Sequence, residues 1–172
     1  SLAVNRDVVK YKMALALLIA SRGYPQIYAG TEIMLDGIAG DYQGHRFDFP
    51  GGWATDNRNA FTPEGRTKEE NEVFNYLQTL LKYRKNNPVL QNGKMKQFIP
   101  QDGIYVYFRY NDNKTIMVIA NNNESKKDLN LSRFKEILTT KTQAKDIVSN
   151  QISELGQTIQ IAPKTVLILE LK

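Results

Sequence analysis

Apolar residues recur at helical spacing between Asp7 and Ser21, near the start of the chain. Positions three or four residues apart lie on one face of a helix, so this pattern predicts a helix over residues 7–21. Asp7 is a residue type that accepts hydrogen bonds from the free N–H groups at a helix start. Ala16, Leu17 and Ala20 add apolar side chains on the other faces, and the second half of the helix is therefore expected to be buried on most sides.

A short apolar run from Gln26 to Gly30 follows this helix. Its length suits a strand of a parallel barrel, because such strands are buried on both faces and need not alternate. Helix, turn and strand together predict half of a βαβ unit. The polar, glycine-rich stretch from Asp36 to about Gly65 predicts a long loop, which inside a compact domain is usually functional or poorly ordered.

Thr67 and Glu70 have the spacing of a capping box, in which each side chain binds a free N–H group at a helix start. One apolar face follows, and Asn86-Asn87-Pro88 is a stop signal. The sequence predicts an amphipathic helix between these points, with Val73, Phe74, Leu77, Leu80, Leu81 and Arg84 on one face.

The period changes to two in the second half of the chain, where Ile104, Val106 and Phe108 alternate with Tyr105, Tyr107 and Arg109. Period-two runs separated by turn residues predict strands of an antiparallel sandwich. Tyrosines on the outer face of such a strand are expected to pack across strands rather than to form a sugar-binding platform. Strands are predicted at 104–109, 115–120, 127–131, 145–149, 158–161 and 166–171, with helical turns over 132–138. The predicted fold class is therefore α+β.

Composition narrows the classes of function. The chain has 172 residues, a formal net charge of +5 and no cysteine. Its lysines are scattered, which is typical of a solvated surface and argues against nucleic-acid binding. No apolar run approaches the ~18–20 residues of a membrane span, and no membrane partner is expected.

Residues Ser21 to Glu32 resemble the segment that enters the eighth barrel strand of the α-amylase family, glycoside hydrolase family thirteen. The family pattern is a small residue, Arg-Gly, an apolar residue, Pro, a polar residue, Ile-Tyr-Tyr-Gly, any residue and Glu. This chain departs from it at Tyr24 and Ala29. The segment from His45 to Trp53, which ends in Phe-Pro-Gly-Gly-Trp, looks closest to neopullulanase and cyclomaltodextrinase-like members, and residues 81–93 resemble the family's last barrel helix and its exit.

This resemblance implies that residues 1–92 are the last helix-strand-helix part of a (β/α)8 TIM barrel and that residues 93–172 are a C-terminal all-β sandwich domain. The parent would be a glycoside hydrolase acting on starch, pullulan or cyclodextrins. A complete barrel takes about 250 residues, so only its end is expected here. The family's catalytic carboxylates lie on earlier strands, and no catalytic residue can be assigned in this chain. The chain alone is therefore expected to be inactive.

The long loop carries the candidate substrate-binding residues. Planar aromatic side chains stack on sugar rings, and polar side chains beside them bind hydroxyl groups. The alternative is a loop packed on itself, with Trp53 as its small core. The candidates are Asp41, Tyr42, His45, Arg46, Asp48 and Trp53.

No cofactor and no metal site is expected in the chain, because His45 is the only histidine and the spacing of Asp36, Asp41 and Asp48 matches no calcium loop; the parent could bind calcium. The expected partner is an α-glucan oligosaccharide, bound by the parent. The isolated chain could also form a homodimer through the exposed barrel remnant at residues 7–30, because an unpaired apolar strand invites pairing.

Two alternatives stay open: a non-catalytic amylase-like domain, such as the ectodomain of an amino-acid transporter heavy subunit, or a carbohydrate-binding or interaction module. The compartment of the parent is unknown, with a secreted or periplasmic one favoured over a cytoplasmic one.

Overall fold

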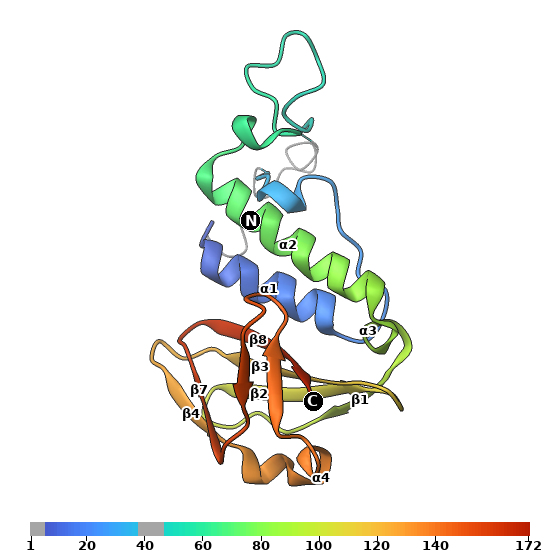
Figure 1. Ribbon diagram of the computed structural model, residues 1–172. Coiled ribbons are helices and arrows are strands. Elements are labelled where there is room, and N and C mark those ends of the chain that lie inside the picture. The colour runs from blue at the N-terminus through green and yellow to red at the C-terminus, as the bar shows by residue number, and fades with distance from the viewer. Residues whose placement is uncertain (1–5, 38–46) are drawn as a thin grey trace.

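The computed structural model describes residues 6–37 and 47–172 (Figure 1). Within them, a six-stranded antiparallel sheet has the order β1-β2-β3-β8-β5-β6, and a second sheet pairs β4 with β7. The strands are β1 (Lys94–Gln97), β2 (Ile104–Tyr110), β3 (Thr115–Asn121), β4 (Lys127–Asn130), β5 (Gln143–Asp146), β6 (Ile152–Glu154), β7 (Thr158–Ile161) and β8 (Thr165–Leu171). The helical elements are α1 (Val8–Ala20), η2 (Thr31–Ile33), η4 (Pro63–Gly65), α2 (Lys68–Asn86), α3 (Pro88–Asn92), η5 (Leu131–Phe134) and α4 (Lys135–Leu138).

Both predicted long helices are confirmed, together with their N-terminal caps. Asp7 Oδ1 accepts hydrogen bonds from the N–H groups of Val9 and Lys10 at 2.9 and 3.1 Å. The capping box of α2 is complete, because Glu70 N–H donates to Thr67 Oγ1 at 3.2 Å and Thr67 N–H donates to Glu70 Oε2 at 2.8 Å.

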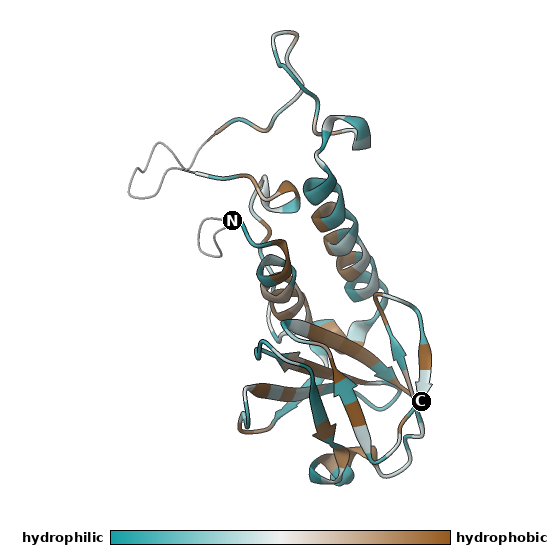
Figure 2. Ribbon diagram, turned by 90° about the vertical axis from the view of Figure 1, so that its left-hand side faces the viewer, coloured by the Kyte–Doolittle hydropathy of each residue, from teal (hydrophilic) through white to brown (hydrophobic). Residues whose placement is uncertain are grey.

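The elements form three layers (Figure 1). Helices α1 and α2 lie against one face of the six-stranded sheet, and the pair β4–β7 with η5 and α4 covers the other face. The central strands are rich in apolar residues (Figure 2). These residues join core clusters on both faces of the sheet. The helix-side core joins residues of α1 and α2 to residues of β2, β3 and β8, so residues 1–92 and 93–172 share one hydrophobic core.

The central strands are buried on both faces, which corrects the expectation of an outer tyrosine face. Tyr107 and Arg109 of β2 are 1% and 0% exposed, because helices α1 and α2 cover that side of the sheet. Tyr105 and Tyr107 do contact each other, with ring centroids 5.4 Å apart. Their contact runs along one strand beneath the helices and not across a solvated face.

The predicted strand at Gln26–Gly30 is wrong for the described structure: these residues pair with no strand among those described. A parallel barrel strand is held by backbone hydrogen bonds to neighbouring strands, and the described residues supply no neighbour for it. Ile27 is half-buried, and Tyr28 is 65% exposed.

In the second half, β2, β3, β4, β7 and β8 lie within a residue or two of their predicted positions, and η5 with α4 supplies the predicted helical turns. Strand β5 begins earlier than expected, and β1 and β6 were not predicted. Both unpredicted strands are short edge strands, whose largely exposed residues carry only a weak period-two signal. The fold of this half is an antiparallel sheet with a smaller two-stranded sheet packed on it.

Candidate functional site

The described part of the long loop lies beyond the N-terminal end of α2, on the side away from the sheet (Figure 1). Arg58 fastens it to that helix, because its guanidinium donates to both carboxylate oxygens of Glu70, at 2.6 and 2.9 Å. Arg58 also donates to the carbonyl of Gly65 at 3.1 Å. The hydrogen bonds from Arg58 hold the pKa of Glu70 below its ordinary value, against the opposing effect of burial. A bidentate hydrogen bond from arginine to an ionised carboxylate is among the stronger polar contacts in proteins.

Arg66 makes a second anchor at the base of the loop. It donates to the carbonyls of Ala60 and Phe61 at 2.8 and 3.1 Å and to Asn71 Oδ1 at 3.2 Å. Its guanidinium lies 3.6 Å from the ring centroid of Phe74, at cation–π distance. Neither arginine was predicted from the sequence. Their partners lie 5–12 residues away, in the loop and in the first turn of α2, and such contacts follow no regular period.

The Phe-Pro-Gly-Gly-Trp segment turns sharply at its two glycines. Gly51 and Gly52 have φ angles of +113° and +106°, a region that side chains disfavour. A Cβ at Gly51 would lie 2.5 Å from Asn59 Oδ1, so the two sides of the loop touch there. Ala60 N–H donates to the carbonyl of Pro50 at 2.8 Å. Residues 50–60 therefore form a closed loop that binds its own backbone.

Asp56 holds the tip of this closed loop. Its Oδ2 accepts hydrogen bonds from the N–H groups of Gly51 and Trp53, both at 3.0 Å, and its own N–H donates to the Trp53 carbonyl at 3.1 Å. The loop is thus packed on itself, as one expectation had it, but Trp53 is not its core. The Trp53 side chain is 70% exposed, which leaves a large aromatic surface free for contact.

Of the six predicted substrate-binding residues, Asp48 and Trp53 lie in the described structure, and both are exposed. The other four, Asp41, Tyr42, His45 and Arg46, lie outside the described residues. The structure adds Phe61, which is 61% exposed and packs against Phe49 with ring centroids 4.6 Å apart. Sequence reasoning missed Phe61, because the loop has no period from which exposure can be read.

Comparison with known proteins identifies the second half of the chain. Residues 95–170 match the family model of the cyclo-malto-dextrinase C-terminal domain. A maltogenic α-amylase of Bacillus acidopullulyticus is 30% identical over 173 residues, which cover 96% of this chain and 26% of the relative. The chain is thus similar to α-amylase-family proteins over almost its whole length.

Other relatives extend the match. A β/α-amylase of Paenibacillus polymyxa is 29% identical over 158 residues, which cover 90% of this chain and 12% of the relative. The solved α-amylase of Geobacillus thermoleovorans in complex with acarbose has a TM-score of 0.70 at 21% identity, covering 98% of this chain and 34% of that one. The chain therefore spans only about a tenth to a third of the length of these α-amylase-family proteins.

An apolar groove of about 430 Å³ lies between the Ile27–Ala29 segment and α2. The aromatic and aliphatic side chains of Phe74, Leu77 and Leu81 form its helix side. Leu77 belongs to the core, whereas Tyr28 on the opposite side is exposed.

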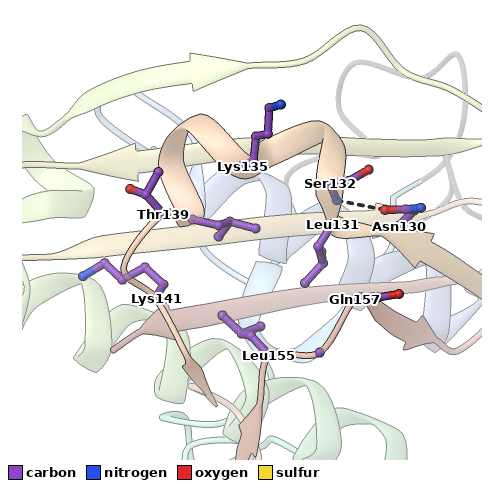
Figure 3. Close-up of a pocket in the computed structure, with 10 residues that line it drawn as sticks. Asn130, Leu131, Ser132, Lys135, Thr139, Lys141, Leu155 and Gln157 are labelled. Atoms are coloured by element: carbon purple, nitrogen blue, oxygen red, sulfur yellow. Dashed lines mark hydrogen bonds between the residues drawn. The ribbon is translucent and has the colours of Figure 1, made fainter.

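A second hollow, of about 600 Å³, lies beside η5 and the segment before β7 (Figure 3). Leu131 and Leu155 project toward each other there, whereas Lys135 projects away from them (Figure 3). Asn130 Oδ1 accepts a hydrogen bond from Ser132 N–H at 2.8 Å and so caps η5. The side chains that line this hollow include no aromatic ring, so a sugar would find no stacking surface in it.

The buried arginines of the chain are structural. Arg84 donates to the carbonyls of Ile19, Ser21 and Gly23 at 2.6, 3.2 and 2.6 Å, where α1 ends. Arg109 donates to the carbonyls of Ala20 and Gly93 at 3.3 and 3.1 Å. Burial lowers the pKa of both guanidinium groups. They satisfy the carbonyls that a helix C-terminus leaves free.

Within residues 6–37 and 47–172, no cluster of three or more histidine, aspartate or glutamate side chains is placed to hold a metal ion. No helix in them combines the length and the apolar character needed to cross a membrane.

Proposed function

We propose that the chain is the C-terminal part of a glycoside hydrolase that acts on α-glucans such as starch, pullulan or cyclodextrins. The observation that carries this proposal is the sequence match to a maltogenic α-amylase, which runs through 96% of the chain and so includes both halves. The parent would supply the catalytic carboxylates, because retaining glycosidases need two carboxyl groups about 5–5.5 Å apart.

In this proposal residues 1–92 are the end of the (β/α)8 barrel, and residues 93–172 are the C-terminal all-β sandwich domain. The apolar groove beside Ile27 supports the first assignment, because a barrel strand at Gln26–Gly30 would need neighbouring strands and helices on that side. The shared core supports the second: the all-β half braces α1 and α2 rather than standing alone.

Trp53 is the proposed sugar contact in the described part of the loop, with Asp48 as a proposed hydrogen-bonding partner for hydroxyl groups. The 70% exposure of the indole supports this role, because an aromatic ring of this size is usually covered unless it contacts a ligand or partner. Asp41, Tyr42, His45 and Arg46 complete the proposed set of substrate-binding residues.

Calorimetric titration with maltoheptaose tests the contact directly. Wild-type chain is expected to bind with a saturable signal, Trp53→Ala to lose it, and Tyr24→Ala to keep it. Tyr24 is the matched control, because it is fully exposed but lies beside Gly93, away from the loop. Equal binding by the wild type and Trp53→Ala would show that Trp53 does not contact the sugar.

Catalysis is tested by the release of reducing sugar from starch, pullulan and cyclodextrin. The full-length parent is expected to release sugar, and the present chain alone none. Hydrolysis by this chain alone would contradict the proposal. A parent that binds maltoheptaose without cleaving it would identify the non-catalytic amylase-like domain instead.

A further inference from the structure

Asp56 is bonded to both backbone polar groups of Trp53. Its carboxylate accepts the Trp53 N–H at 3.0 Å, and its own N–H binds the Trp53 carbonyl at 3.1 Å. The same carboxylate oxygen accepts the N–H of Gly51 at 3.0 Å. One side chain therefore holds the backbone on both sides of Gly52, immediately before the indole.

The two glycines explain why the backbone needs the hydrogen bonds from Asp56. Gly51 and Gly52 adopt positive φ angles, and glycine loses more backbone freedom on ordering than any other residue. Without a partner for the N–H groups of Gly51 and Trp53, the tip could turn in many ways. The other anchors act elsewhere: Arg58 and Arg66 bind the base of the loop at Glu70, Ala60 and Phe61.

An ordered tip has a direct consequence for binding. A ligand that stacks on a mobile side chain must order it, and each side chain ordered in this way weakens binding. A side chain that is already ordered avoids that loss. Trp53 projects into solvent from a backbone whose orientation is set before any ligand arrives.

We propose that Asp56 is the positioning residue for Trp53, holding its indole in the orientation in which an α-glucan stacks on it. The proposal rests on the proposed function for its ligand. Asp56 itself touches no sugar in this scheme and acts only through the backbone of Trp53.

Trp53 is the only tryptophan in the chain, so tryptophan emission reports on this residue alone. Time-resolved emission anisotropy of the ligand-free chain is expected to show slow indole motion in the wild type and fast local motion in Asp56→Ala. Asp56→Asn keeps one acceptor oxygen and is expected to fall between them. Asp128→Ala removes an exposed aspartate of β4 and should match the wild type.

Maltoheptaose titration of the same variants is the second readout. Asp56→Ala is expected to raise Kd about three- to tenfold, the range for ordering one side chain on binding. Unfolding midpoints for all variants show whether each chain is folded.

The outcomes separate the two proposals. Unchanged anisotropy in a folded Asp56→Ala chain would overturn the positioning role, as would fast indole motion with an unchanged Kd. Fast indole motion in Asp56→Ala, together with no maltoheptaose binding by the wild type, supports the positioning role and counts against the proposed glucan ligand.

Discussion

The Tyr83 hydroxyl donates a hydrogen bond of 2.5 Å to Oε2 of Glu170, which ties the last turns of helix α2 to strand β8. Lys114, the residue just before strand β3, contacts the same carboxylate oxygen at 3.0 Å and donates to Asn87 Oδ1 at 2.6 Å. Burial raises the pKa of the Tyr83 phenol, and the bond to Glu170 raises it further. This cluster joins the two halves of the chain by polar contacts, in addition to their shared hydrophobic core.

Tyr83→Phe should therefore destabilise the chain by about 1.5–3 kcal/mol, the range for a hydrogen bond to a charged group. Urea unfolding followed by circular dichroism measures this loss. Tyr105→Phe is the control, because its hydroxyl bonds the neutral Gln97 side chain at an exposed position and is expected to cost less than about 1 kcal/mol. Equal losses of unfolding free energy in the two variants would show that the Tyr83–Glu170 hydrogen bond stabilises the chain no more than the Tyr105–Gln97 one.

Arg84→Met should lower the free energy of unfolding by about 2–4 kcal/mol, because it leaves the carbonyls of Ile19, Ser21 and Gly23 without their donor. Methionine keeps much of the aliphatic volume, so the loss reports the missing hydrogen bonds. Arg84→Lys keeps the charge but lacks the planar fork and should lose less. An Arg84→Met chain as stable as the wild type would mean that water replaces the guanidinium at the end of α1.

The Arg58–Glu70 pair should make stability depend on acid pH. The pKa of Glu70 is lower in the folded chain than its ordinary value, so the folded state holds the ionised form. Its contribution is fully present above the ordinary glutamate pKa of about 4.3 and is lost as the pH falls through the lower, folded value. In wild-type minus Glu70→Gln unfolding free energies, the difference should shrink as the pH falls through that window. A difference that stays constant across it would contradict the pairing.

The same pair should control the order of the loop. Arg58→Lys cannot make the two-pronged bond, so amide hydrogen exchange at residues 50–62 should quicken, while exchange in β2 and β3 stays slow. Lys12→Ala breaks a more exposed ion pair with Glu72, which joins α1 to α2 away from the loop, and serves as the control. Unchanged exchange in the loop of Arg58→Lys would assign the anchoring to Arg66 instead.

The isolated chain should self-associate through residues 7–30. Val9, Leu18 and Tyr28 are 50%, 41% and 65% exposed, and the apolar groove opens beside Tyr28. Exposed apolar side chains beside an apolar groove favour association. Light scattering at rising concentration should show a dimer that Leu18→Lys with Tyr28→Ser returns to a monomer. A wild-type chain that stays monomeric at high concentration would show that this face does not pair with itself.

Local signals predicted α1 and α2 well. Asp7 and Thr67-Glu70 act within one helical turn, so their neighbours in sequence are also their partners in space. Period-two alternation likewise located β2, and the turn after it located β3 as the returning strand. The short edge strands β1 and β6 were missed although each pairs with a strand next to it in sequence, because their few, largely exposed residues carry only a weak period-two signal.

The sequence by itself determined the two long helices, the central strands and the resemblance to the α-amylase family, because each depends on residues close together along the chain. Only the tertiary structure decided that β2 is buried on both faces, that the Gln26–Gly30 segment has no strand partner among the described residues, and that Trp53 is exposed while its backbone is bound by Asp56. Each of these depends on which surface a residue meets, and a linear pattern of residue types carries no record of that.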